Sequence, residues 1–390
     1  MQTIDTEQLS ELQQILVYFS QNSGSDLFVT AGLPITMKKD GNLVQLTEHK
    51  VSPKQASDLC AELMNAEQLD DFIKHSESNF AFQIPGHGRY RVNVYVQRGT
   101  PGMVIRNVKT EIPDFSELNL PEVLKEQILK KRGLILFVGG TGSGKSTSLA
   151  ALVDIRNTET HNHIITIEDP IEFMHRHKSS IVTQREVGVD TESYEAALKN
   201  TLRQAPDVIL IGEIRAQETM EHAIAFAETG HLCLSTLHAN NTNQALDRII
   251  NFFPPNQKNH ILLDLSLNLR MIVSQRLVPK IGGGMIAAVE VMLNTPRISQ
   301  LIFKGEVTEI KDQIKNSTAQ GMQTFDQSLF NLYESGQISY EDALKNADAM
   351  NDLRLEIKLK SKRPPPSNEF GAFDDTPQFS MQKTEEEEQD

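Results

Sequence analysis

The sequence predicts an α/β protein with a mostly parallel sheet, preceded by a small α+β domain. Apolar runs alternate with amphipathic segments in the second part of the chain, which is the pattern of parallel strands joined by crossover helices. A glycine-rich loop separates the first of these runs from a helix-permissive segment, as in phosphate-binding sites. Before residue 110, shorter runs with alternating polarity predict antiparallel strands. The strand-like runs of the second part are 134–138, 163–167, 208–212, 232–236 and 285–291.

Composition limits the classes of function. The chain has 390 residues, which is typical of two or three domains, and a formal net charge of −14. This acidic balance argues against a nucleic-acid partner. Cys60 and Cys233 are the only cysteines, so no C-x-x-C zinc ribbon is available. Because no apolar run reaches about 18 residues, we expect a cytoplasmic protein.

The first 110 residues predict helices and antiparallel strands. One helical face within 1–22 is predicted by the spacing of its apolar residues, which are Leu9, Leu12, Ile15, Leu16 and Phe19. The predicted order continues with a strand, a turn and a strand over 28–46 (with Asp40-Gly41 in the turn), a helix over 53–73 and strands over 80–108.

One of these predicted strands carries arginines. Val92, Val94 and Val96 share one face, and Arg89, Arg91 and Asn93 share the other. Alternation alone favours a solvated polar face. The alternative is a charge contact with a nucleotide, including one held by a neighbouring subunit.

The remaining boundaries follow from composition. Two prolines and little periodicity predict a linker around 113–121, and 298–303 and 324–359 are expected to be helical. After Lys362 the composition becomes polar and ends in Glu385–Glu388, which predicts a disordered acidic tail. We therefore expect an N-terminal domain over 1–112, a linker over 113–121, a core over 122–361 and a tail over 362–390.

The chemistry centres on a glycine-rich loop that fits G-x-x-x-x-G-K-[ST] at every fixed position. A buried strand, a glycine loop and a helix direct backbone N–H groups and the positive helix end at a phosphate. In this pattern Lys145 reaches the β- and γ-phosphates, and the Ser146 hydroxyl ligates Mg²⁺. The alternative, a glycine-rich turn with a chance lysine, is disfavoured by the flanking strand and helix. The expected ATP-binding residues are Gly139, Gly140, Thr141, Gly142, Ser143, Gly144, Lys145, Ser146 and Thr147.

Two carboxylates follow predicted strands. Glu168 ends the run 163–167, where ligands bind in parallel sheets. It is expected to hold Mg²⁺ through water or to orient the attacking water. Glu213 follows the run 208–212 and is expected to accept a proton from that water. Because no aspartate ends that run, the metal role is left to Glu213 or Glu168. For the segment with Glu168, the alternative is that Asp169-Pro170 only turns the chain. For Glu213, the alternative is an exposed charge at a strand end.

Two histidines flank the next run. His238, and with it His231, is expected to reach the same edge and contact the γ-phosphate as a switchable donor. The alternative for each is a structural hydrogen bond.

Taken together, these stretches resemble the secretion-superfamily ATPases that drive type IV pili and type II secretion. The resemblance covers almost all of residues 5–350. The stretches that carry it are GGTGSGKST (139–147), ITIEDPIE (165–172), QAPDVILIGEIR (204–215), TGHLCLSTLHAN (229–240), AGLP (31–34) and GRYRVN (88–93).

Within that family the chain looks like a pilus retraction ATPase of the PilT/PilU kind. Longer relatives carry an extra N-terminal domain and a four-cysteine zinc module, which two isolated cysteines exclude. PilT-type members carry an Ala-Ile-Arg-Asn signature, whereas residues 297–305 here read RISQLIFKG. Together with the polar tail, this departure looks like the PilU branch.

The resemblance implies a homohexamer of PAS-like N-terminal domains and RecA-like cores. It implies ATP hydrolysis with Mg²⁺, completed across subunits by Arg91 and Arg106, with Arg89 as a further candidate. The implied function is pilus retraction at the inner face of the cytoplasmic membrane, as an accessory to a PilT-type ATPase and with an inner-membrane platform protein. Two alternatives remain: an ATP-binding scaffold with little motor activity, and a nucleic-acid translocase, which the acidic charge disfavours.

Overall fold

The computed structural model describes residues 9–39, 41–108 and 111–363. These residues form two compact units. One contains the described chain up to Leu277 together with Val289–Thr324, and the other contains Val278–Ala288 and the described residues from Phe325 onwards.

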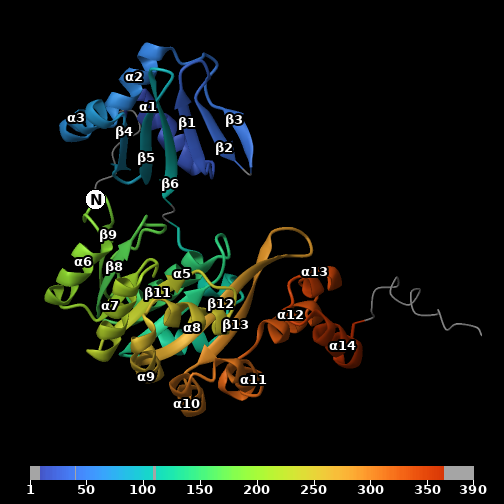
Figure 1. The fold of residues 1–390 in the computed structure, drawn as a ribbon. Coiled ribbons are helices and arrows are strands. Elements are labelled where there is room, and N and C mark those ends of the chain that lie inside the picture. Colours follow the sequence, from blue (N-terminus) through green and yellow to red (C-terminus); the bar gives the residue numbers. More distant parts are fainter. Residues whose placement is uncertain (1–8, 40, 109–110, 364–390) are drawn as a thin grey trace, which may run out of the picture. The chain divides into compact units, whose positions relative to one another are not determined.

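The first part of the chain builds an antiparallel sheet with the strand order β3-β2-β1-β6-β5-β4 (Figure 1). Its helices bury apolar stripes in a core that includes Leu12, Phe19 and Val92. The strands are β1 Asp26–Thr30, β2 Thr36–Lys39, β3 Asn42–Gln45, β4 Glu77–Ile84, β5 Gly88–Gln97 and β6 Thr100–Val108. The helices are α1 Glu11–Gln21, α2 Pro53–Glu62 and α3 Ala66–His75.

Several predicted elements of this part differ from the structure. The segment 28–46 holds three strands rather than two; Asp40 and residues 1–8 of the predicted first helix lie outside the described residues. The single helix predicted over 53–73 is two helices. Asn65 starts the second one, because its side chain accepts a hydrogen bond from the backbone N–H of Gln68 and the Gln68 side chain accepts one in return.

The alternation predicted along β5 is confirmed for its central residues. Val92 and Val94 are fully buried, whereas Val96, near the end of the strand, is 40% exposed. Arg91 lies directly opposite Arg106 on β6, so the polar face of the sheet brings two arginines side by side.

The second sheet has the order β13-β12-β7-β11-β10-β8-β9. Every pair from β12 to β9 is parallel, which confirms the mostly parallel sheet. A short turn joins β12 and β13, so this edge pair is antiparallel. The strands are β7 Gly133–Val138, β8 His163–Glu168, β9 Ile181–Glu186, β10 Val208–Ile211, β11 Leu232–Leu237, β12 Leu269–Pro279 and β13 Met285–Leu293.

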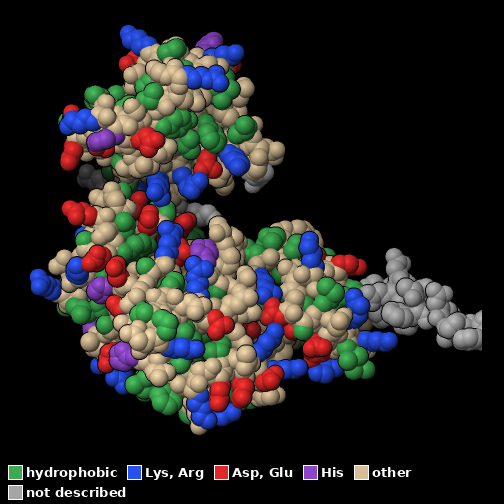
Figure 2. All heavy atoms as spheres, in the orientation of Figure 1, with side chains coloured by type: hydrophobic (Ala, Val, Ile, Leu, Met, Phe, Trp, Pro, Cys, Tyr) green, Lys and Arg blue, Asp and Glu red, His purple; other side chains and the backbone are tan. Residues whose placement is uncertain are grey.

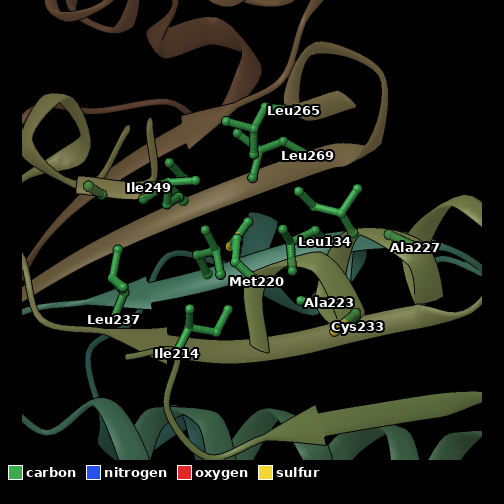
Figure 3. Packing of buried hydrophobic residues seen from close by; sticks show 14 of the residues in the cluster. Leu134, Ile214, Met220, Ala223, Ala227, Cys233, Leu237, Ile249, Leu265 and Leu269 are labelled. Carbon is green, nitrogen blue, oxygen red and sulfur yellow. The ribbon is translucent and has the colours of Figure 1, made fainter. Parts of the chain in front are cut away.

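Helices connect and cover these strands (Figure 1). The apolar side chains of α7 pack against buried residues of β7 and β11, including Leu134 and Cys233, as Figure 3 shows. The helices of this part are α4 Val123–Ile128, α5 Lys145–Glu159, α6 Tyr194–Thr201, α7 Gln217–Glu228, α8 Thr242–Asn251, α9 Lys258–Asn268, α10 Pro296–Lys304 and α11 Ile310–Lys315.

Two strands were not predicted. β9 carries polar residues over most of its length, and β12 buries the polar side chains Ser274 and Gln275. Gln275 accepts a hydrogen bond from Ser148 at 2.9 Å. The sequence around Gln275 does not show that Ser148, on a distant helix, is its partner. From the sequence alone, Gln275 therefore looks like an exposed polar residue.

The second unit contains α12 Phe325–Glu334, α13 Tyr340–Lys345 and α14 Met350–Lys360. The continuous helical segment predicted over 324–359 is therefore wrong. Gly336 adopts a φ of 74°, which ends the helical path, and Ser339 caps the next helix by accepting from the Asp342 N–H. Residues from 364 onwards, and with them most of the predicted tail, lie outside the described residues.

On the face shown in Figure 2, acidic and basic side chains are intermixed. In the part of the chain that the structure describes, none of the helices combines the length and the apolar character needed to span a bilayer.

Candidate functional site

The parallel sheet brings the glycine loop, Glu168, Glu213 and His238 to one edge. Because β7, β11, β10 and β8 run in the same direction, the segments that follow their carboxyl ends are neighbours. A cavity of about 320 Å³ opens there. Its lining includes Thr141, Gly142, Lys145, Ser146, Glu168, Asp169, Tyr194, Gly212, Glu213, Arg215, Thr236 and His238.

The glycine loop connects β7 to α5 through a backbone path that only glycine permits. Gly144, directly before the helix, has a φ of 85°. A Cβ atom on Gly139 would lie 2.5 Å from the carbonyl oxygen of Gln275 and 2.5 Å from Oγ of Ser143. The loop is therefore packed tightly against β12 on one side while its other side faces the cavity.

Lys145, the first residue of α5, is buried at the cavity wall. Its Nζ donates hydrogen bonds of 2.8 Å to the carbonyl oxygens of Gly139 and Gly140. Burial lowers the pKa of this amine, and the negative charge of Glu213 opposes the shift. A phosphate in the loop would supply the anionic partner that this ammonium group lacks.

The loop contains a further polar group suited to a phosphate. The buried Ser143 Oγ has no hydrogen-bond partner among the described residues. A buried hydroxyl without a partner is costly, and a phosphate oxygen would satisfy it. The loop residues Gly139 to Thr147 therefore have the donor groups that a nucleoside triphosphate requires.

Glu168 is the last residue of β8. Its Oε1 accepts a 2.7 Å hydrogen bond from Thr166 and a 3.4 Å one from Gln184. Burial nevertheless raises the pKa of this carboxyl to about 7, because desolvation of the charged form outweighs these hydrogen bonds. A cation in the cavity would stabilise the ionised form.

Glu213 follows β10 and is held from two sides. Arg215 contacts its Oε2 with Nε at 2.9 Å and Nη2 at 2.7 Å. His238, directly after β11, places Nε2 at 3.1 Å from Oε1. With 16% of its side chain exposed, Glu213 has a fixed orientation in the cavity lining.

The expectation that His231 lies at the same edge is wrong. His231 precedes β11 and His238 follows it, and six strand residues at about 3.3 Å each separate the two ends by roughly 20 Å. The His231 ring contacts Oγ1 of Thr229 at 3.1 Å and the carbonyl oxygen of Phe226 at 3.2 Å. Its role is therefore to join the end of α7 to the start of β11.

None of the predicted arginines lines this cavity. Arg106 donates to Oδ1 of Asp26 at 3.0 Å on the neighbouring strand β1. Arg89 Nη2 lies 3.6 Å from Oε2 of Glu186. Arg91 lies beside Arg106 on the N-terminal sheet. A single chain thus assembles the loop, both carboxylates and His238, but not these arginines.

Sequence reasoning also missed residues of the site. Arg215 could have been predicted from the sequence, because it follows Glu213 by two positions. No sequence motif points to Tyr194 or Gln275. They belong to α6 and β12, and only the order of the strands in the folded sheet places these elements near the site.

Comparisons with known proteins identify the family of this chain. Residues 6–335 match the family model described as type II/IV secretion system protein. The type IV pilus ATPase PilU of Pseudomonas aeruginosa is 57% identical over 90% of this chain and 92% of the relative. The type IV pilus retraction ATPase PilT of the same organism is 40% identical over 86% of this chain and 98% of the relative.

A solved structure extends the match to three dimensions. The crystal structure of the pilus retraction motor PilT with bound ADP superposes with a TM-score of 0.83 at 39% identity, covering 89% of this chain and all of that one. The chain therefore belongs to the type II/IV secretion ATPase family, in its PilT/PilU group of type IV pilus retraction ATPases, and is more similar to the PilU relative than to the PilT relatives.

Proposed function

We propose that this chain hydrolyses ATP in the cavity at the carboxyl edge of its parallel sheet and that hydrolysis drives type IV pilus retraction. The observation that carries the proposal is the convergence of the glycine loop, Glu168, Glu213 and His238 on one cavity. These are the groups that phosphoryl transfer needs: a cradle for phosphates, a carboxylate near the metal, a base and a donor for the transferred phosphate.

The loop binds and orients the triphosphate. Residues Gly139 to Thr147 provide backbone N–H groups, and Lys145 moves from the carbonyl oxygens of Gly139 and Gly140 to the β- and γ-phosphates. The positive end of α5 adds to this attraction. Binding therefore replaces the internal partners of Lys145 with a stronger anionic one.

The residues also fit Mg²⁺. The Ser146 hydroxyl is suited to bind the ion directly, and Glu168 to bind it through water, since both line the cavity and oxygen ligands suit this hard cation. When bound, Mg²⁺ neutralises charge on the phosphates. Its charge would also keep Glu168 ionised at a pH where burial alone favours the protonated form.

Glu213 is the general base in this proposal. Its carboxylate takes a proton from the attacking water, while Arg215 and His238 keep it oriented. His238 lies on the rim with 37% of its side chain exposed, so its ring can also contact the γ-phosphate.

We further propose that the site is completed in a homohexamer. Arg91 and Arg106 lie side by side outside the cavity of their own chain, with Arg106 already paired with Asp26. A neighbouring subunit's phosphates would give the two guanidinium groups a common anionic partner. Arg91→Ala is then expected to lower ATP hydrolysis in assembled hexamers without changing stability. Full activity of that variant would exclude the role.

The similarity to a PilU relative supports an accessory role beside a PilT-type ATPase and an inner-membrane platform protein. We also propose a location at the inner face of the cytoplasmic membrane and a division of the chain into domains at about residues 112, 121 and 361. Pilus retraction measured in cells with and without the PilT-type partner tests the role. Retraction only with the partner supports an accessory motor, and retraction without it shows an autonomous one. An ATPase-inactive variant with full retraction would instead indicate a scaffold.

A further inference from the structure

Tyr194 places a phenol hydroxyl among the acidic groups of the cavity. It is the first residue of α6, whose N-terminus is capped by Ser193. Its side chain lines the same cavity as Glu168, Asp169 and Glu213. Neither the phosphate loop nor the two carboxylate motifs includes this residue.

The absence of a side chain at Gly212, the residue before Glu213, leaves room for this hydroxyl. A Cβ atom on Gly212 would lie 2.9 Å from Tyr194 Oη and 3.1 Å from Cα of Glu168. The phenol oxygen therefore lies beside Gly212, where the segments that carry Glu168 and Glu213 are joined by a 2.7 Å hydrogen bond from the Gly212 N–H to the carbonyl oxygen of Ile167. A side chain on residue 212 would push it away.

The hydroxyl remains protonated in these surroundings. Burial raises the pKa of Tyr194, and the negative charges of Asp169 and Glu168 raise it further. Within the part of the chain that the structure describes, no hydrogen bond joins the hydroxyl to another protein group. It can therefore offer its lone pairs to a molecule in the cavity.

We propose that Tyr194 is a catalytic residue of this site, whose phenol oxygen accepts a hydrogen bond from the attacking water while Glu213 accepts the other. A water molecule with both hydrogens held by acceptors directs its lone pair at the phosphorus atom. The inference rests on the proposed ATP hydrolysis.

The step is balanced without an additional reactant. The water oxygen forms a bond to the γ-phosphorus, and the bond from that phosphorus to the β,γ-bridging oxygen breaks, leaving ADP. One water proton passes to Glu213. The other, held by Tyr194, stays on the oxygen and becomes part of the released phosphate. The O–H bond of Tyr194 is not broken.

The test is Tyr194→Phe, which removes one oxygen and keeps the ring. The matched control is Tyr18→Phe, because Tyr18 is 52% exposed on α1. We expect Tyr194→Phe to lower kcat about tenfold, equivalent to about 1.4 kcal/mol, with KM for ATP and the thermal midpoint unchanged. Tyr18→Phe should match the wild type in all three.

A double variant separates a catalytic role from a structural one. If Tyr194 and Glu213 act on the same water, adding Tyr194→Phe to Glu213→Gln should change the residual turnover less than about twofold. Three results would overturn the inference: an unchanged kcat, a raised KM at constant kcat, or a full tenfold loss in the Glu213→Gln background. A wild-type protein without ATPase activity would overturn the proposed function as well, whereas an active wild type with an equally active Tyr194→Phe would overturn only this inference.

Discussion

Nε2 of His238 lies 3.1 Å from Oε1 of Glu213, and the two residues follow neighbouring parallel strands, β11 and β10. This contact exists because the strands end at the same edge of the sheet. It links the two residues that we propose to contact the phosphate and the attacking water.

This contact predicts different effects for the two histidines that flank β11. His238→Ala removes the ring that lies 3.1 Å from Glu213 Oε1 and is expected to lower kcat about tenfold, equivalent to about 1.4 kcal/mol. His231→Ala should leave kcat within about twofold, because His231 lies at the opposite edge. Steady-state ATPase assays of both variants test this. Equal losses would show that the effect is structural.

Lys145→Ala is expected to weaken ATP binding. The variant loses the ammonium group at the phosphate loop, and a charge-assisted hydrogen bond is worth about 1.5–3 kcal/mol, or roughly 10- to 100-fold in affinity. Equilibrium binding of a fluorescent ATP analogue measures the loss. The control is Lys199→Ala, which removes an exposed lysine paired with Glu195 on α6. Unchanged binding by Lys145→Ala would exclude this loop as the nucleotide site.

Glu168 predicts a pH dependence of stability. Burial raises its pKa from 4.5 to about 7, so the folded chain binds this proton more tightly than the unfolded chain does. Protonated Glu168 therefore contributes fully to the free energy of unfolding below pH 4.5. This contribution, of up to about 3 kcal/mol, is lost as the pH rises through about 7.

The check is urea unfolding of wild type and Glu168→Gln at pH 5 and pH 7.5. The neutral amide cannot lose a proton, so the variant should gain stability relative to wild type at the higher pH. Glu159→Gln, which changes an exposed carboxyl at the end of α5, is the control. A constant difference between wild type and Glu168→Gln at both pH values would contradict the predicted shift.

Gly212→Ala is expected to destabilise the protein by about 1–3 kcal/mol, the usual cost of overpacking. The new Cβ would collide with the Tyr194 hydroxyl and the Glu168 backbone. Thermal unfolding measures the effect. Gly140→Ala is the control for stability, because nothing lies within 4 Å of its Cβ position. A Gly212→Ala variant as stable as wild type would contradict this prediction and would show that the cavity wall rearranges to accommodate the methyl group.

Much of this architecture could be predicted from the sequence, because the signals are local. Buried parallel strands appear as apolar runs, and the glycine loop has a fixed spacing. The position of His231 could also have been predicted correctly, since a residue that precedes a strand lies at its amino end and not at its carboxyl end. Tyr194 and Gln275 were beyond sequence reasoning, because only the packing of distant segments gives them a position. The break before α3 was missed because the Asn65 cap lies within an otherwise helical pattern.

The central claim is that this cavity hydrolyses ATP with Glu213 as the base. The most direct measurement compares ATP binding and turnover of the wild type and Glu213→Gln in the presence of Mg²⁺. We predict that the variant binds ATP with wild-type affinity but turns it over at least about 100-fold more slowly, the usual contribution of a general base. Turnover equal to that of the wild type would contradict the claim.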